Sequence, residues 1–381
     1  MDDPRHFLSK LHSKVVTRER LSLEDGLDLF RSPDVVKIGD LAQSVRRRLH
    51  GNTVYYSVNF HLNHTNVCDT RCYFCAFSRD AGDLGAYTLT VDEIETRVRE
   101  ALARWDINEV HIVGGHNPAL RLDYYTEMIR RLRQIKKERA GTGEGKNVPL
   151  FIKAFSATEI NGIAKREGLG IREVLEILKQ AGLDSMPGGG AEIFSPEVRR
   201  KICPRKMSGE EWIAAHRTAH ELGIPTNATM LYGHLENDHD CVEHMLKIRA
   251  LQDETGGFQA FIPLPYCQPR SKSGPAALPR SVPGETSGYL DLKVLSIARL
   301  MLDNVPHVRV HGAATGLKLA QASLSFGVDD IGGTNLDEKI MRESGGANGE
   351  KSLSPADLVR YIENDGYTPC LTDSSYAGLQ V

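Results

Sequence analysis

The sequence lacks a hydrophobic run long enough to cross a membrane, and it lacks an excess of charge of either sign. A membrane-spanning helix needs about 20 consecutive apolar residues. The first residues, MDDPRHFLSKLHSK, have no apolar core of the kind found in secretory signals. Lys and Arg number 47 against 50 Asp and Glu, a formal net charge of −3. We therefore expect a cytoplasmic protein with no nucleic-acid or membrane partner.

Cysteine is scarce, and its distribution excludes a disulfide framework. The chain has seven cysteines among 381 residues, and three of them lie within eight residues. Disulfide-rich secreted domains are short and carry an even set of cysteines. The sequence therefore predicts a metal site in a reducing compartment, with ordinary thiols at the four remaining positions: Cys203, Cys241, Cys267 and Cys370.

Strand-like segments alternate with segments of helical period along most of the chain. Eight candidate strands lie at 54–60, 109–115, 150–155, 184–193, 228–233, 260–266, 307–312 and 329–334. Helix starts between them carry capping boxes, Thr90 with Glu93 and Ser208 with Glu211. Eight such units predict an α/β fold in which parallel strands close into a (β/α)8 barrel of the TIM type. An open doubly wound sheet or a barrel of six units is the alternative, because three glycines interrupt the fourth strand.

Three regions are expected along the chain. Residues 1–50 precede the first strand and contain amphipathic segments, which predict an N-terminal helical extension. Residues 51–336 contain the barrel. Residues 337–381 are expected to form a C-terminal helical tail packed on the barrel, because Ser354-Pro355 is typical of a helix start.

Three closely spaced cysteines follow the first candidate strand, Cys68, Cys72 and Cys75 in the pattern C-x3-C-x2-C. Thiolates suit iron–sulfur clusters, and three of them bind three irons of a [4Fe–4S] cluster while leaving the fourth iron open to a small molecule. The carboxyl ends of barrel strands are also where this fold places its chemistry. The alternative is a non-catalytic zinc or redox-sensing protein, whose zinc would need a fourth ligand such as Cys203 or His64.

The cysteine spacing, with Phe74 before the last cysteine, resembles the signature of the radical S-adenosylmethionine (SAM) superfamily. That resemblance implies a [4Fe–4S] cluster and SAM as cofactors, a small-molecule substrate, and an external one-electron donor such as flavodoxin or ferredoxin. The cofactors supply a 5′-deoxyadenosyl radical. The resemblance also implies SAM contacts at the strand ends, which we expect at Gly114, Gly115, Glu192, Tyr232 and Ile262.

Longer segments resemble aminofutalosine synthase, a radical enzyme of the futalosine route to menaquinone. They include CDTRCYFCAFSR, IKAFSATEI, PGGGAEIF and NATMLYGHLE. Leu264 also matches this family, where the sister enzyme cyclic dehypoxanthine futalosine synthase usually has Trp. The resemblance implies a transferase that adds the adenosyl radical to the enol ether of 3-[(1-carboxyvinyl)oxy]benzoate. Rearrangement and decarboxylation then give 6-amino-6-deoxyfutalosine.

One turn favours the alternative within the superfamily. Residues 114–118, GGHNP, are more similar to the sister enzyme, which acts by hydrogen abstraction and cyclisation. Related deazaflavin-forming synthases act in the same way. The sequence therefore leaves a cyclase of this type open as the second hypothesis.

A substrate with two carboxylates requires cations or hydrogen-bond donors around it. The residues considered for this contact lie in matching segments or on the first strand, and they are Arg79, Lys153, Lys206, Arg299, Asn59 and His61. His234 is considered for substrate contact or proton transfer, and a purely structural histidine is the alternative.

Overall fold

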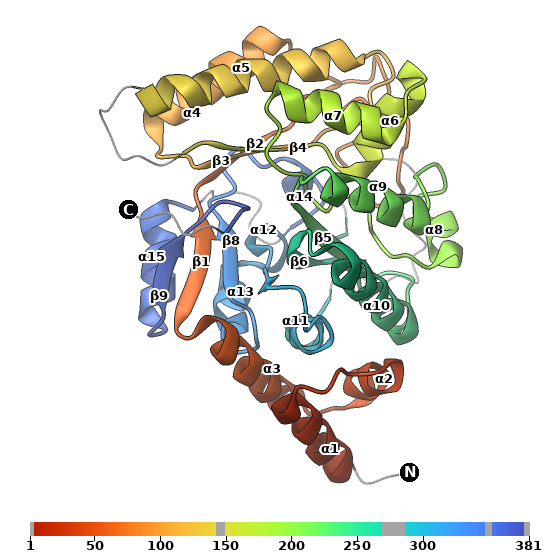
Figure 1. The fold of residues 1–381 in the computed structure, drawn as a ribbon, viewed down its shortest axis with the longest axis vertical. Helices are drawn as coiled ribbons and strands as arrows, with labels where there is room; N and C mark the ends of the chain where they lie inside the picture. Colours follow the sequence, from red (N-terminus) through yellow and green to blue (C-terminus); the bar gives the residue numbers. More distant parts are fainter. Residues whose placement is uncertain (1–3, 142–148, 269–285, 347–352, 377–381) are drawn as a thin grey trace.

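The computed structural model describes residues 4–141, 149–268, 286–346 and 353–376. Within these residues, short strands occupy the centre of the molecule and helices surround them (Figure 1). None of the helices in these ranges has the length and apolar character that a membrane crossing requires.

The strands pair in parallel throughout. They are β1 (Thr53–Ser57), β2 (Asn59–Leu62), β3 (Glu109–Ile112), β4 (Phe151–Ala154), β5 (Thr226–Tyr232), β6 (Phe258–Pro265), β7 (His307–Val308), β8 (Asp330–Gly333) and β9 (Thr368–Leu371). They form three sheets, in the orders β8-β1-β9, β2-β3-β4 and β5-β6-β7.

The three sheets are joined into a ring by the continuity of β1 with β2 and by isolated β-bridges. β1 continues almost directly into β2, and this joins the first two sheets. The remaining gaps are spanned by isolated parallel bridges, which pair Lys153 with Ser185, Met186 with Thr226, and Arg309 with Asp330. The α/β barrel predicted from the alternating units is therefore confirmed.

The fourth predicted strand, 184–193, does not form. Only Ser185 and Met186 make bridges there, and the glycines that follow bring the backbone against β5. A Cβ on Gly188 would lie 2.7 Å from the backbone oxygen of Asn227, and Gly190 has φ of +94°. The chain therefore leaves the ring early at this position and crosses toward the mouth of the barrel.

The first predicted strand, 54–60, is interrupted at Val58. The Asn108 side chain fills the interruption, since its Oδ1 accepts from the Val58 backbone N–H at 2.8 Å and its Nδ2 donates to the Thr372 carbonyl at 2.8 Å. Before Val58, the strand β1 pairs with β9. After Val58, the strand β2 pairs with β3. The prediction of a purely helical tail over 337–381 is therefore wrong, because the tail also adds the strand β9 to the barrel.

Helices connect the strands and cover the outside of the ring. They are α4 (Val91–Arg104), α5 (Leu122–Gly141), α6 (Ala157–Glu167), α7 (Ile171–Ala181), α8 (Pro196–Ile202), α9 (Gly209–Glu221), α10 (Asp238–Thr255), α11 (Gly288–Met301), α12 (Gly312–Thr315), α13 (Leu317–Ser323), α14 (Ile340–Glu343) and α15 (Pro355–Asn364). The capping boxes predicted at Thr90 with Glu93 and at Ser208 with Glu211 are both present.

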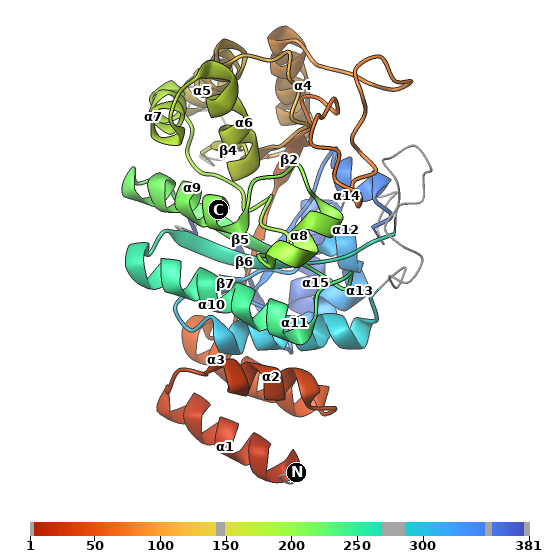
Figure 2. The ribbon, with the colours of Figure 1, turned by 90° about the vertical axis from the view of Figure 1, so that its right-hand side faces the viewer.

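The first three helices lie outside the barrel at one end of the molecule. They are α1 (Pro4–Thr17), α2 (Leu23–Arg31) and α3 (Val35–His50). Figure 2 shows them beyond α11, and the contacts of α3 with α11 and of α2 with α10 and α11 anchor them there. Gly39 permits this close packing, because a Cβ at this position would lie 2.4 Å from the Phe326 ring.

Buried charged side chains form ion pairs inside the barrel and next to its strands. Lys153 on β4 lies 2.6 Å from a Glu109 carboxylate oxygen on β3, and neither side chain has exposed surface. Arg309 donates to Asp330 at 2.8 Å. Arg299 pairs with Asp329 just outside the strands, again with no exposed surface. These buried charges are compensated by each other, which buried ions require.

Candidate active site

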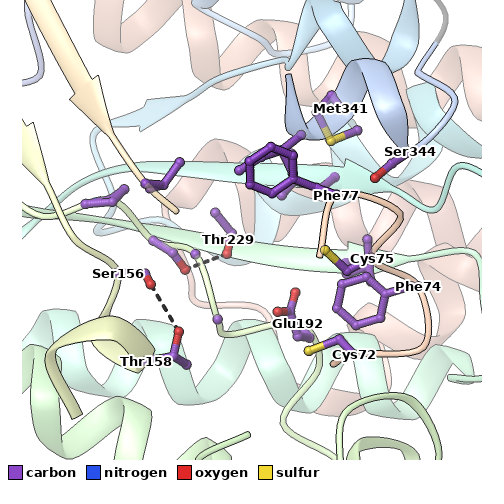
Figure 3. A pocket seen from close by; sticks show the side chains of 18 of the residues that line it. Cys72, Phe74, Cys75, Phe77, Ser156, Thr158, Glu192, Thr229, Met341 and Ser344 are labelled. Carbon is purple, nitrogen blue, oxygen red and sulfur yellow. Dashed lines mark hydrogen bonds between the residues drawn. The ribbon is translucent and has the colours of Figure 1, made fainter. Parts of the chain in front are cut away.

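A cavity of about 290 Å3 lies at the carboxyl ends of the barrel strands. Each of the strands from β2 to β8, or the segment directly after it, contributes at least one lining residue. On β5 the lining positions Asn227, Thr229 and Leu231 alternate along the strand, as inward-facing residues do. Figure 3 shows Cys72, Phe74 and Cys75 on one side of this cavity and Ser156 with Thr158 on the other.

The cysteine loop between β2 and α4 presents all three predicted ligands to the cavity. Cys68, Cys72 and Cys75 line it together. Backbone hydrogen bonds fix the loop: Cys68 donates to the Arg79 carbonyl at 3.0 Å, and Cys75 donates to the Cys72 carbonyl at 3.1 Å. The loop is therefore shaped by its own backbone, with the thiols directed to one space.

The Arg79 side chain stabilises this loop and does not line the cavity. Its guanidinium donates to the Ala76 carbonyl at 2.5 Å and the Ser78 carbonyl at 3.1 Å, and it pairs with Glu343 at 3.1 Å. These contacts hold the guanidinium on the cysteine loop, and Arg79 is absent from the cavity lining, so the expectation that it binds substrate finds no support in the geometry.

The positions of the cysteine thiols can be compared with the geometry of a zinc site. Tetrahedral zinc with Zn–S bonds of about 2.3 Å brings its sulfur ligands to about 3.8 Å from one another. Across the described ranges, the only three His, Cys, Asp or Glu side chains whose ligand atoms all lie within 4.8 Å of one another are His50, His307 and Asp329. Cys68, Cys72 and Cys75 are not such a group, so their thiols are not gathered as tetrahedral zinc would hold them.

Gly114 and Gly115 line the cavity as predicted, and the packing behind them already requires glycine. A Cβ on Gly114 would lie 2.5 Å from the His64 ring, and a Cβ on Gly115 would lie 2.2 Å from the Val67 carbonyl oxygen in the cysteine loop. Gly115 also donates its N–H to the Thr65 carbonyl at 2.8 Å. These glycines therefore bring the turn after β3 against the cysteine loop.

Glu192 and Lys206 form an ion pair in the cavity wall beside the cysteines. Their side-chain atoms lie 2.5 Å apart, and both residues line the cavity. Burial disfavours the Glu192 charge, but the Lys206 ammonium outweighs it and holds the pKa of Glu192 below its usual value. Glu192 has φ of +45°, an unusual backbone conformation that persists where surrounding structure imposes it. Here the Leu231 N–H binds the Glu192 carbonyl at 2.7 Å.

Glu159 is a cavity residue that the sequence did not single out. It accepts a hydrogen bond from the Gly114 N–H at 3.0 Å and from the Ser156 N–H at 2.8 Å. Burial raises its pKa to about 7, although these hydrogen bonds act in the opposite direction. Its place at the third position of α6, in a capping box with Ser156, was readable in the sequence as a helix start.

Of the SAM contacts predicted at Tyr232 and Ile262, only Ile262 lines the cavity. Tyr232 is buried and its hydroxyl donates to Asp291 at 2.8 Å, outside the cavity. His234 is also absent from the lining: its Nε2 lies 3.1 Å from the Leu231 carbonyl and its Nδ1 lies 3.0 Å from Glu236. The predictions of a ligand contact for Tyr232 and a chemical role for His234 are contradicted, and both residues support the turn after β5.

Three further substrate candidates lie away from the cavity. Lys153 is buried against Glu109, and Arg299 is buried against Asp329. Asn59 accepts from the Asn335 N–H at 2.8 Å and lies beneath the His61 ring. These three predictions are therefore wrong, whereas Lys206 and His61 do line the cavity.

The class of protein follows from these observations. A parallel α/β barrel carries a loop of three cysteines at the carboxyl ends of its strands, next to an acidic side chain and a ligand-sized cavity. That arrangement is the one expected of a radical SAM enzyme, in which Cys68, Cys72 and Cys75 would hold the [4Fe–4S] cluster.

Comparison with known proteins supports this class and narrows it. Residues 62–248 match the model of the Radical SAM superfamily, and residues 255–381 match the CofH/MqnC C-terminal region. The chain is 42% identical over 380 residues to an aminodeoxyfutalosine synthase of Thermus thermophilus, covering 100% of this chain and 97% of that one. The chain therefore belongs to the radical SAM superfamily, in the family that these two models describe.

Other relatives are named for a reaction different from that of the aminodeoxyfutalosine synthases. A 5-amino-6-(D-ribitylamino)uracil–L-tyrosine 4-hydroxyphenyl transferase of Methanopyrus kandleri is 40% identical, with 91% of this chain and 90% of that one covered. Among solved structures, the [FeFe]-hydrogenase maturase HydG superposes with a TM-score of 0.74 at 16% identity over 97% of this chain and 77% of that one. The structural similarity supports the fold alone.

Proposed function

We propose that this protein is an aminodeoxyfutalosine synthase. In this proposal the 5′-deoxyadenosyl group adds to the enol ether of 3-[(1-carboxyvinyl)oxy]benzoate, and rearrangement with loss of carbon dioxide gives 6-amino-6-deoxyfutalosine. SAM is consumed, and an external one-electron donor reduces the cluster.

The observation that supports this proposal most is the apolar surface that β6 contributes to the cavity. Ile262 and Leu264 line the cavity side by side along the strand, and Leu264 is the residue by which the sequence resembles aminofutalosine synthase and not its sister enzyme. Phe77 and Met341 add further apolar surface (Figure 3). An apolar wall of this kind suits an aromatic ring, while the match to the Thermus relative extends over the whole chain.

The protein side chains have distinct tasks in this proposal. The bound cluster and SAM supply the adenosyl radical. Glu192, kept ionised by Lys206, offers carboxylate oxygens to the ribose hydroxyls or ammonium group of SAM. Glu159 holds the Gly114 backbone, so that the turn after β3 keeps its place beside the cysteine loop.

The second candidate is a tyrosine-dependent transferase, favoured by the 40% identity to the Methanopyrus enzyme. That relative is named for L-tyrosine and a ribitylaminouracil as reactants. A hydrogen-abstracting enzyme of this or the cyclase type would release 5′-deoxyadenosine, whereas radical addition keeps the adenosyl group in the product.

Anaerobic turnover separates the two candidates. Reconstituted enzyme, reductant and SAM labelled in the adenine are incubated with the enol ether dicarboxylate or with tyrosine and the ribitylaminouracil. With the dicarboxylate only, we expect labelled adenine in a product whose mass equals the adenosyl group plus the diacid, less carbon dioxide and one hydrogen atom. The hydrogen is lost because the last radical must give up an electron and a proton. Free 5′-deoxyadenosine in step with tyrosine consumption would contradict the proposal.

A further inference from the structure

The cavity lining contains little free positive charge. In the part of the chain that the structure describes, Lys206 is the one Lys or Arg among the lining residues, and it is paired with Glu192. The other charged lining residues are carboxylates, Glu159 and Glu338, and both accept backbone hydrogen bonds. A substrate carboxylate that enters this cavity must therefore be recognised by groups other than a free cation.

Three imidazoles lie together on the inner wall of the cavity and form what we call the histidine floor: His61, His111 and His311. His61 on β2 and His111 on β3 are register partners, so both point inward at one level. Their rings stack with centroids 4.6 Å apart. His311 joins them from the segment after β7.

The histidine floor adjoins the Lys153–Glu109 ion pair. Lys153 is the register partner of His111 on β4, and it is held by Glu109 one level down. Asn335 and Asn59 contact the His61 ring at 3.2 and 3.1 Å. These contacts fix the position of His61. No asparagine is recorded in contact with the His111 or His311 ring among the described residues, and both rings line the cavity.

Hydrogen-bonding capacity at this floor is unused within the protein. The His111 ring lines the cavity and is stacked on His61, and among the described residues the buried His311 Nδ1 has no hydrogen-bond partner outside its own residue. The buried Asn227 Oδ1, on a cavity-lining residue of β5, also lacks a partner. Buried polar atoms are normally satisfied, so unsatisfied ones that surround a cavity indicate a polar ligand group.

We infer that the histidine floor binds a carboxylate of the substrate, with His111 and His311 donating N–H hydrogen bonds to its oxygens. The inference rests on the proposed function and specifies how a dicarboxylate is recognised without Arg or Lys. Burial, together with the nearby Lys153 and Arg309 charges, keeps the pKa of His111 well below its usual value, so the free enzyme presents a neutral donor here.

Binding without turnover tests this inference. Holoenzyme with oxidised cluster and SAM is titrated with 3-[(1-carboxyvinyl)oxy]benzoate and with its two monomethyl esters. We expect His111→Phe and His311→Phe each to weaken binding of the diacid at least about tenfold, the loss of one charge-assisted hydrogen bond. His111→Gln, which keeps an N–H donor, should stay within about threefold of the wild type, and the exposed His239→Ala should have no effect.

The esters identify the carboxylate involved. One monoester should bind the wild type at least about tenfold more weakly than the diacid, yet bind His111→Phe almost as well as the diacid does, because the two changes remove one interaction. SAM affinity should remain unchanged in the histidine variants. Equal diacid affinity in the wild type and both Phe variants would overturn the inference while leaving the proposed function standing.

A parallel titration separates failure of the proposed function from failure of the inference. If the wild type binds L-tyrosine and not the diacid, the proposed function is wrong, and tyrosine with its methyl ester then tests the histidine floor by the same comparison. If neither acid binds the wild type, both the proposed function and the inference are overturned.

Discussion

Buried carboxylates at the amino ends of β3 and β8 are paired with cations, whereas two buried polar atoms of the described residues that line the cavity have no partner. The Glu109–Lys153 and Arg299–Asp329 pairs are closed to solvent and to ligands. The His311 and Asn227 atoms around the cavity are unsatisfied. A buried charge must be paired in the folded state itself, while an unsatisfied donor can be completed by a bound molecule. The paired charges therefore serve the fold, whereas the unsatisfied cavity atoms are available to a ligand.

The largest expected contrast is between two cysteines at opposite ends of the barrel. Cys72→Ala removes a cluster ligand and should reduce SAM cleavage to background, with iron content lost as well. Cys370→Ala, on β9, should retain activity. Reductive SAM cleavage measured by chromatography checks both variants. Cleavage that survives in Cys72→Ala would contradict the assignment of the cysteine loop.

Breaking a pair at the amino end should cost stability. Arg299→Met leaves Asp329 buried without its guanidinium partner, and we expect the free energy of unfolding to fall by about 3–5 kcal/mol. Urea denaturation followed by circular dichroism measures this change. The control is Arg217→Met on the surface, whose pair with Glu254 is solvent-exposed and should contribute less than about 1 kcal/mol. Similar losses in both variants would remove the distinction between the two ends.

Asp329, in the ion pair with Arg299, should make the stability of the protein depend on pH. Burial opposes the charge of Asp329, but Arg299 and His307 outweigh it and lower its pKa to about 2 in the folded protein. An unfolded Asp has a pKa of about 3.9. The stabilisation is therefore complete above about pH 4 and is lost as the pH falls toward 2.

Thermal unfolding between pH 5 and pH 2 measures this loss. We expect the melting temperature of the wild type to decline through this range more steeply than that of Asp329→Asn, which starts lower. Parallel curves for the two proteins would show that Asp329 does not carry the acid sensitivity.

The smallest of these effects is expected at the carboxyl end, in the Glu192–Lys206 pair. Glu192→Gln removes the charge but keeps the size, and SAM should bind about tenfold more weakly. The matched control is Glu197→Gln on α8, an exposed residue paired with Lys201, which should leave SAM affinity unchanged. Equilibrium binding to the oxidised holoenzyme distinguishes them. Unaltered affinity in Glu192→Gln would exclude this side chain from the SAM site.

Local sequence patterns predicted the features that depend on neighbouring residues. The cysteine loop, the capping boxes at Thr90 and Ser208, and the alternation of strands and helices are all encoded within a few residues. Cys68 was found from the spacing of the cysteines, and Gly114 and Ile262 were found through the resemblance to the radical SAM superfamily.

Features that depend on distant residues were not predictable in this way. β9 pairs with β1, and Thr372 reaches Asn108, across more than half of the chain. The charges of Lys153 and Arg299 suggested substrate contacts, but their partners Glu109 and Asp329 are separated from them in the sequence and neutralise them. His111 escaped notice because its role depends on register with His61.

Magnetic resonance of the reduced holoenzyme with isotope-labelled SAM tests the central claim most directly. If Cys68, Cys72 and Cys75 leave one iron open, 15N in the methionine amino group and 17O in its carboxylate should show hyperfine coupling to the cluster, and Cys72→Ala should lose the signal. A protein that contains one zinc per chain, or a cluster whose spectrum does not change when labelled SAM is added, would contradict the account.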